Sequence, residues 1–396
     1  MRAASVAICL AASVSPILAH ADQAPAPAPE TPVAAPPPAV APPPPAPAPA
    51  AQPEFEWHPF GFLRMEYIAV QDDPNVAFVG RNDGFEIQNA RLGAIGRLGS
   101  RVGFALSFDG AVDERTQVNS PQGNLAVGLR DAFVDVRLTE SRPLVARAGF
   151  FQTLVDPEAL VPDTSREFVD KPIETRGMVA TEGYQTAGLP PGRSQGVALR
   201  FDPQVGREDG VAAGFELAAQ NGADEFSSNN DNDALALSAT GILAMPHGSW
   251  AVASVRYNPR TVGDLPFRQD EDDVQGTLGL HVVVGPLSLT GGGIVQRTTF
   301  PTTGGPVQNA FGAHAQAMVR VYARTGAESL WVGYRFGVLD PSSLVTTDRV
   351  IEHTAGALLV VPRYRMRFQL QAVHVVEQTG RELSNDRIQL AGEVVL

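Results

Sequence analysis

Apolar and polar residues alternate along most of the chain from Phe55 to Leu396. In the clearest stretch, 363–371, arginines and glutamines at the odd positions alternate with Tyr364, Met366, Phe368 and Leu370. Successive side chains of a β-strand point to opposite faces, so this stretch predicts a strand with one apolar and one wet face. Five residues on one face span roughly 27 Å, close to the roughly 30 Å hydrocarbon core of a bilayer. A half-buried strand of a soluble protein would alternate in the same way.

The connections between the alternating segments favour the membrane interpretation. We count about 16 segments, and every second connection is short. The short connections lie at 99–101, 139–143, 203–209, 246–248, 285–286, 325–326 and 362, whereas the others are long and polar, including the acidic stretch Asn258–Asp273. Outer-membrane barrels have this asymmetry, and a sheet that spans a bilayer must close on itself to pair its backbone amides. The pattern therefore predicts an all-β fold, a transmembrane antiparallel β-barrel over residues 55–396.

The first 54 residues follow different rules. Met1 and Arg2 precede an apolar run that ends in Ala19-His20-Ala21, as in a secretory signal peptide over residues 1–21. Residues 22–54 are almost entirely alanine and proline, which predicts a disordered, extended linker because proline fixes φ and lacks an amide hydrogen. With an even number of strands this linker would lie in the periplasm. It is either a tether to the cell envelope or a spacer without a function of its own.

Composition excludes several functions. The formal net charge of −13 argues against a nucleic-acid partner, because such proteins need a basic face. The one cysteine, Cys9, lies in the predicted signal peptide, so the mature chain has no disulfide. Its histidines are scattered, and no Asp-His-Ser group can be assembled from strand neighbours. We therefore predict no enzyme, no cofactor and no metal site.

Several short motifs resemble the phosphate-selective porin family, porins O and P. They are Phe85–Gly93, Gly96–Leu98, Phe104–Asp109, Leu129–Val136, Arg147–Gln152 and Pro191–Val197, which follow one another in the family's order. The resemblance covers most of residues 60–245. It implies a 16-stranded homotrimeric channel whose third loop, here residues 154–193, folds inward and narrows the pore. The anion selectivity of that family also leans on loop lysines, and Lys171 is the single lysine of this chain.

Two groups of charged residues are candidates for controlling the passage. Arginines on the predicted lumen face favour anions, because a guanidinium can bind phosphate with two N–H groups. The pore-lining candidates are Arg64, Arg91, Arg97, Arg147, Arg200, Arg256, Arg320, Arg335, Arg363, Arg365 and Arg367. The third loop holds more acids than bases, which predicts an acidic constriction that repels anions. Its constriction candidates are Asp163, Arg166, Glu167, Asp170, Lys171 and Arg176.

The sequence thus supports a passive outer-membrane porin for small polar or anionic solutes, with lipid and lipopolysaccharide around it. The acidic stretch Asp270–Asp273 could bind divalent cations that bridge lipopolysaccharide, or it could be solvated charge. A non-conducting structural barrel tethered by the linker is the alternative function. A soluble secreted β-protein is the third hypothesis.

Overall fold

A computed structural model describes most of the chain after the linker. The described residues are 55–80, 83–110, 127–140, 143–203, 205, 207–222, 230, 232–263, 266–324, 328–378 and 382–396. The predictions of a signal peptide at 1–21 and a linker at 22–54 lie outside these residues. The barrel belongs to a unit formed by Gln52–Leu396.

Sixteen antiparallel strands form one closed barrel, as the alternation predicts. The strands are β1 (Phe55–Val70), β2 (Gly84–Leu98), β3 (Val102–Asp109), β4 (Gly128–Arg137), β5 (Leu144–Gln152), β8 (Arg193–Phe201), β9 (Ala212–Asn221), β10 (Leu235–Ala244), β11 (Trp250–Val262), β12 (Gln269–Val284), β13 (Leu287–Thr299), β14 (Gln308–Ala323), β15 (Ser329–Asp340), β16 (Arg349–Val361), β17 (Met366–Gln378) and β18 (Arg387–Val395). Barrel strands that follow one another in sequence are paired. Strand β5 pairs with β4 and, across the third loop, with β8.

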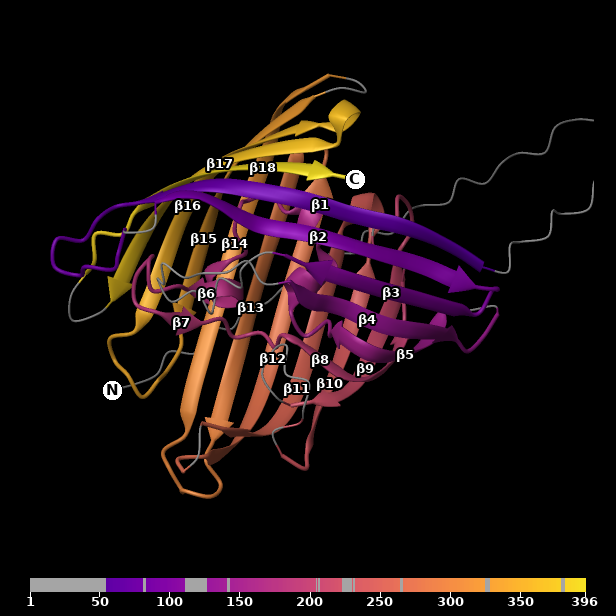
Figure 1. Cartoon of the computed structure of the whole chain (residues 1–396), viewed down its shortest axis with the longest axis horizontal. Coiled ribbons are helices and arrows are strands. Elements are labelled where there is room, and N and C mark those ends of the chain that lie inside the picture. Colours follow the sequence, from indigo (N-terminus) through magenta and orange to yellow (C-terminus); the bar gives the residue numbers. More distant parts are fainter. Residues whose placement is uncertain are drawn as a thin grey trace, which may run out of the picture. The chain divides into compact units, whose positions relative to one another are not determined.

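The barrel closes where β1 lies beside β18, which places the two ends of the barrel segment together (Figure 1). The register pairs Phe62 with Val395 and Val70 with Arg387. The amide of Leu396 donates to the carbonyl of Gly61 at 2.9 Å and extends this ladder to the last residue. Closure leaves no exposed sheet edge, which a barrel in a bilayer requires.

The two faces of the strands separate apolar from polar side chains as predicted. On β1, Leu63, Met65 and Tyr67 are exposed on the outside, whereas Arg64 and Glu66 are buried inside the barrel. On the last strand Ile388 and Leu390 face outward and Gln389 faces inward. Within the described residues, no helix has the length and apolarity needed to cross a membrane.

Strand length divides most of the barrel into a low wall of short strands and a high wall of long strands. The strands β3, β4, β5, β8, β9 and β10 have 8 to 10 residues each. The strands from β11 to β17 have 12 to 16 residues. Short connections alternate with long ones, as between β12 and β13, where Val284 and Leu287 flank a two-residue turn.

Two predictions about local structure were wrong. The strand expected to begin at Arg363 begins at Met366, because Pro362–Tyr364 form a 3₁₀ turn and Arg365 has a left-handed φ of 51°. The acidic stretch Asn258–Asp273, expected to be a loop, is mostly a hairpin. Its charges pair across β11 and β12, so that Arg260 binds Glu271 at 2.9 Å and Asp273 at 2.8 Å. These cross-strand ion pairs support the extension of the sheet.

Candidate functional site: the constriction

The third loop carries its own small elements inside the barrel. They are two 3₁₀ turns, η1 (Pro157–Leu160) and η2 (Asp163–Ser165), a short helix α1 (Ile173–Arg176), and a two-stranded sheet of β6 (Gly177–Met178) and β7 (Thr186–Ala187). Apolar loop residues are buried against the wall. Ile173 and Met178 pack with Leu339, Val350 and Val373, and Phe168 packs with Met318 and Leu358. The loop is thus seated by apolar contacts as well as by charge.

Glycines on the inner face of the high wall make room for the loop. A Cβ atom at Gly279 would lie 2.6 Å from Pro157, one at Gly337 would lie 3.0 Å from Ile173, and one at Gly356 would lie 2.9 Å from Phe168. A Cβ atom at Gly312 would overlap the side chain of Glu174. These four glycines, on β12, β14, β15 and β16, are the glycine seat of the third loop. Any larger residue there would take space that the loop occupies.

One set of ion pairs holds the loop at the seam of the barrel. Arg64 on β1 donates through Nε to Glu393 on β18 at 2.9 Å and through Nη2 to the carbonyl of Asp163 at 2.6 Å. Arg367 on β17 donates to the carbonyls of Thr164 and Arg166, and its Nη1 lies 3.6 Å from Glu393. Because these charge-assisted bonds are accepted by backbone carbonyls, they do not depend on the identity of the loop side chains.

A second set of ion pairs holds the later part of the loop. The carboxylate of Glu352 on β16 accepts from Arg176 at 2.7 Å and from Arg387 at 2.8 Å. Arg176 also donates to Glu182 at 2.6 Å, and Arg387 lies 3.6 Å from Asp170. Buried charges of this kind are tolerated because each has a partner of opposite sign, and removing one partner leaves an uncompensated charge.

Most acids of the third loop have partners on the wall or within the loop. Asp170 and Glu182 belong to the ion pairs above, and Asp156 lies 3.7 Å from the Nζ of Lys171. Glu174 pairs with His314, and Glu167 accepts from Gln316 at 2.5 Å. The loop turns these carboxylates towards the wall or its own cations, because burial without a partner would cost several kcal/mol per ion.

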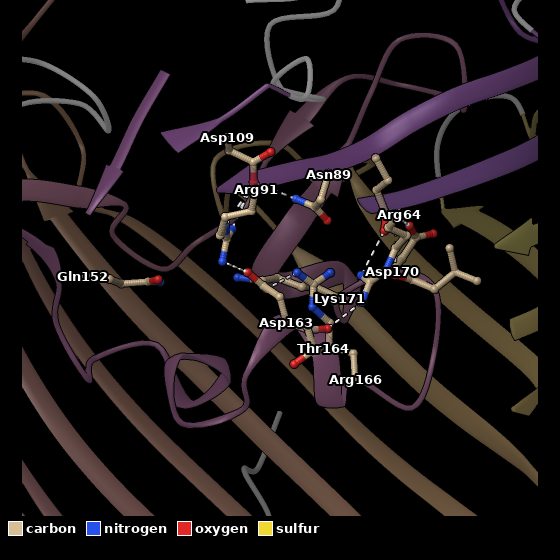
Figure 2. Close-up of polar contacts among 12 residues, drawn as sticks. Arg64, Asn89, Arg91, Asp109, Gln152, Asp163, Thr164, Arg166, Asp170 and Lys171 are labelled. Atoms are coloured by element: carbon tan, nitrogen blue, oxygen red, sulfur yellow. Dashed lines mark hydrogen bonds and ion pairs between the residues drawn. The ribbon is translucent and has the colours of Figure 1, made fainter. Parts of the chain in front are cut away.

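Charged side chains of loop and wall meet at one place, shown in Figure 2. Arg91 on β2 binds Asp109 at 3.1 Å and Asp163 of the loop at 2.5 Å, and Asp163 also pairs with Arg166. These residues and Lys171 are the loop–wall cluster. The side chain of Lys171 is 21% exposed, whereas its partner Asp156 is 1% exposed. Gln152, at the end of β5, lies apart from the cluster (Figure 2).

The low wall continues this charged surface in pairs. Arg193 binds Asp131 at 3.0 Å, Arg147 binds Asp135 at 2.8 Å, and Arg200 binds Glu216 at 3.1 Å. Arg130 lies within electrostatic range of Arg91, Arg193 and Asp163. We call these side chains, together with the loop–wall cluster and Asp156, the charged surface. It contains seven cations and six carboxylates, namely Arg91, Arg130, Arg147, Arg166, Lys171, Arg193 and Arg200 with Asp109, Asp131, Asp135, Asp156, Asp163 and Glu216. The surface is therefore closely balanced, with a small positive excess.

Sequence reasoning missed Arg130 and Arg193. Strict alternation places Arg130 on the outer face, together with Ala132 and Val134. The pairing of β3 with β4 shifts between Ser107 and Phe108, so that Arg130 is the extra residue of a bulge. A bulge turns the side chain of its extra residue away from the regular alternation, and a single sequence gives no signal of its position.

The predicted pore-lining arginines separate into four groups. Arg64, Arg335 and Arg367 hold the loop, and Arg91, Arg147 and Arg200 belong to the charged surface. Arg97 pairs with Glu56 near a short turn, Arg256 donates weakly to Gln275 at 3.4 Å, and Arg320 lies over the ring of Trp331. Arg363 and Arg365 are exposed in the turn before β17, away from the wall strand to which they were assigned.

The ion pair of Asp163 should resist acid. Burial alone would raise the pKa of this carboxyl, but the neighbouring Arg166 and Arg91 outweigh it and hold the pKa well below its ordinary value. A carboxyl whose pKa is lower in the folded than in the unfolded state stabilises the fold at pH values above its unfolded-state pKa. This contribution is lost as the pH falls through its folded-state pKa. We expect channel conductance and current noise to stay constant between about pH 7 and about pH 4, above the unfolded value of about 3.9. Asp163→Asn is the control, and we expect it to be noisier across this range.

Comparisons with known proteins identify the fold. No known protein family matches the sequence, and no curated protein does. An anion-selective porin from Comamonas acidovorans is 15% identical with a TM-score of 0.58, covering 87% of this chain and all of that one. The outer-membrane channel DcaP of Acinetobacter baumannii is 13% identical with a TM-score of 0.56, covering 86% and 97%. OmpT of Vibrio cholerae, in its trimer form, is 9% identical with a TM-score of 0.57, covering 87% and 100%. The chain thus has the fold of outer-membrane porins.

Proposed function

We propose that the protein is a passive diffusion channel of the bacterial outer membrane for small polar solutes, with a modest preference for anions. The observation that carries this proposal is the position of the charges at the constriction. Asp156, Asp170 and Glu182 of the loop are paired with cations of the loop or the wall, while Lys171 is the more exposed member of its ion pair. Solutes would pass between the loop–wall cluster and the inner faces of β3, β4, β5 and β8, where Asp131 and Arg147 are partly exposed.

Planar-bilayer recording tests this proposal. We expect the purified full-length protein to give stepwise ion currents, and a reversal potential in a salt gradient that corresponds to a permeability ratio for chloride over potassium of roughly two to ten. A cation preference would contradict the anion assignment. A complete absence of ion steps would instead favour the alternative, a structural barrel tethered by residues 22–54. Phosphate in place of chloride tests the narrower preference that the resemblance to porins O and P implies.

A homotrimer is the assembly that we propose for this channel. The low wall presents an apolar concavity on its outer face, with a volume of about 680 Å³, lined by small and branched residues such as Val134, Ala146, Ala148, Val197 and Ala219. Small residues let neighbouring elements approach closely inside a bilayer. The trimer form of the Vibrio cholerae protein supports this arrangement.

A further inference from the structure

A cavity of about 380 Å³ lies between the third loop and the high wall. The wall contributes side chains of five successive strands, Trp250, His281, Thr290, Gln316 and Arg335. Val205 and Gly248, in two short connections, line it at one end of the barrel. Its volume falls within the roughly 300–1,000 Å³ that is usual for small-molecule sites.

The polar groups of the cavity include the buried guanidinium of Arg335. Arg335 is 2% exposed and donates through Nη1 to the carbonyl of Asp170 at 2.8 Å. Its Nη2 is buried and has no hydrogen-bond partner within the described part of the chain. A buried guanidinium N–H without a partner is costly, and a ligand oxygen would satisfy it. Thr290 and His281 lie 2.9 Å apart at the other side of the cavity.

Apolar side chains form another part of the lining. Leu160 and Val161 from the loop and Val205 pack around Trp250, whose ring stacks on His281 with centroids 5.9 Å apart. Phe168 lies against the guanidinium of Arg335, with the ring centroid 4.9 Å from Cζ. A ligand for this cavity therefore needs an apolar body in addition to a charged end.

Three carboxyl groups also line the cavity and bear on the sign of the ligand. Glu167 accepts from Gln316, and Asp170 accepts from Gln371 at 3.3 Å and lies near Arg387. Burial raises the pKa of Glu158, so that this carboxyl holds its proton more readily than usual and can donate a hydrogen bond. Of the three acids, Asp170 is compensated by Arg387 and Glu167 is hydrogen-bonded, and the raised pKa of Glu158 reduces its opposition to an anion.

The cavity adjoins the route proposed for solutes. Arg166 lines it and also pairs with Asp163 in the loop–wall cluster. We propose that this cavity binds small organic carboxylates, with the carboxylate at the guanidinium of Arg335 and the apolar body against Trp250, Val161 and Val205. The inference rests on the proposed channel function in one respect, because the ligand reaches the cavity through the lumen.

Calorimetry on the folded, detergent-solubilised protein tests the site without reference to conduction. We expect benzoate to bind with a Kd of about 1 mM, and acetate, which lacks the apolar body, to bind at least about tenfold more weakly. Thr290→Phe fills the cavity from β13 and should weaken benzoate binding at least about tenfold. Leu289→Phe, one residue away on the outer face, is the matched control and should bind as the wild type does.

Each outcome decides something. Equal binding of benzoate and acetate, or unchanged binding by Thr290→Phe, would overturn the site. If Thr290→Phe does not fold, Val205→Glu replaces it, and its added carboxylate should likewise abolish benzoate binding. Chloride steps in a bilayer without benzoate binding would refute the cavity and leave the channel function intact. Benzoate binding without any ion steps would support the cavity and refute the channel.

Discussion

Replacing Gly312 with valine is expected to raise the single-channel conductance by about twofold or more, because the third loop must leave its seat. The Cβ atom at this position would overlap Glu174, which pairs with His314 on the same strand. Strand β14 cannot yield, since it is bonded to β13 and β15 along its length. Overpacking costs roughly 1–3 kcal/mol, and movement of the loop relieves it with fewer lost hydrogen bonds than distortion of the wall.

Gly241→Val is the matched control for this substitution. Gly241 is also a strand glycine, on β10, but a Cβ atom there would have open space around it. We expect its conductance to equal that of the wild type. An unchanged conductance in Gly312→Val, with a normally folded barrel, would show that the loop does not set the width of the channel.

Neutralising the loop cations is expected to abolish the anion preference. In the double variant Arg166→Gln/Lys171→Gln, the charged surface loses two cations and becomes net negative, so that the chloride over potassium permeability ratio should fall roughly threefold or more. The wall contact survives, because Arg367 and Gln369 bind the backbone carbonyl of residue 166 and not its side chain. Reversal potentials in the same salt gradient measure the effect.

Arg363→Gln/Arg365→Gln removes the same charge at a different place. Both arginines are exposed in the turn before β17. We expect the permeability ratio of this variant to change by less than about 1.5-fold, since exposed charges beyond a Debye length of about 8 Å are screened. If the turn variant shifted selectivity as much as the loop variant, a general surface charge would control passage.

The fold was largely predictable because alternation and connection length are local signals. A strand between lipid and water changes polarity from one residue to the next, as Leu63 to Tyr67 of β1 and Arg387 to Leu390 of β18 do. Local chemistry also explains the main error. Residues 363–365 alternate like a strand, but Pro362 fixes φ and starts a turn, which moved Arg363 and Arg365 off the wall.

The site was less predictable because it depends on partners distant in sequence. A count of loop charges indicated an acidic constriction, yet Glu174 and Asp170 face partners on strands 140 or more residues later. Of the arginines predicted to line the pore, Arg335 and Arg367 hold the loop through its backbone carbonyls. Glycines such as Gly337 and Gly356 gave a usable signal, since a glycine inside a strand often marks a close approach of another segment.

The contact of Arg64 with both Glu393 and Asp163 has a consequence for the order of assembly. Arg64 and Glu393 are 329 residues apart, so the chain must be almost complete before they meet. Pairings so distant in sequence form late, because loop-closure entropy opposes them until other contacts are in place. The same guanidinium also binds the carbonyl of Asp163. Closure of the barrel and this contact with the third loop are therefore completed in the same folding step. A chain arrested before its last strand would therefore lack both the closed barrel and this contact of the third loop.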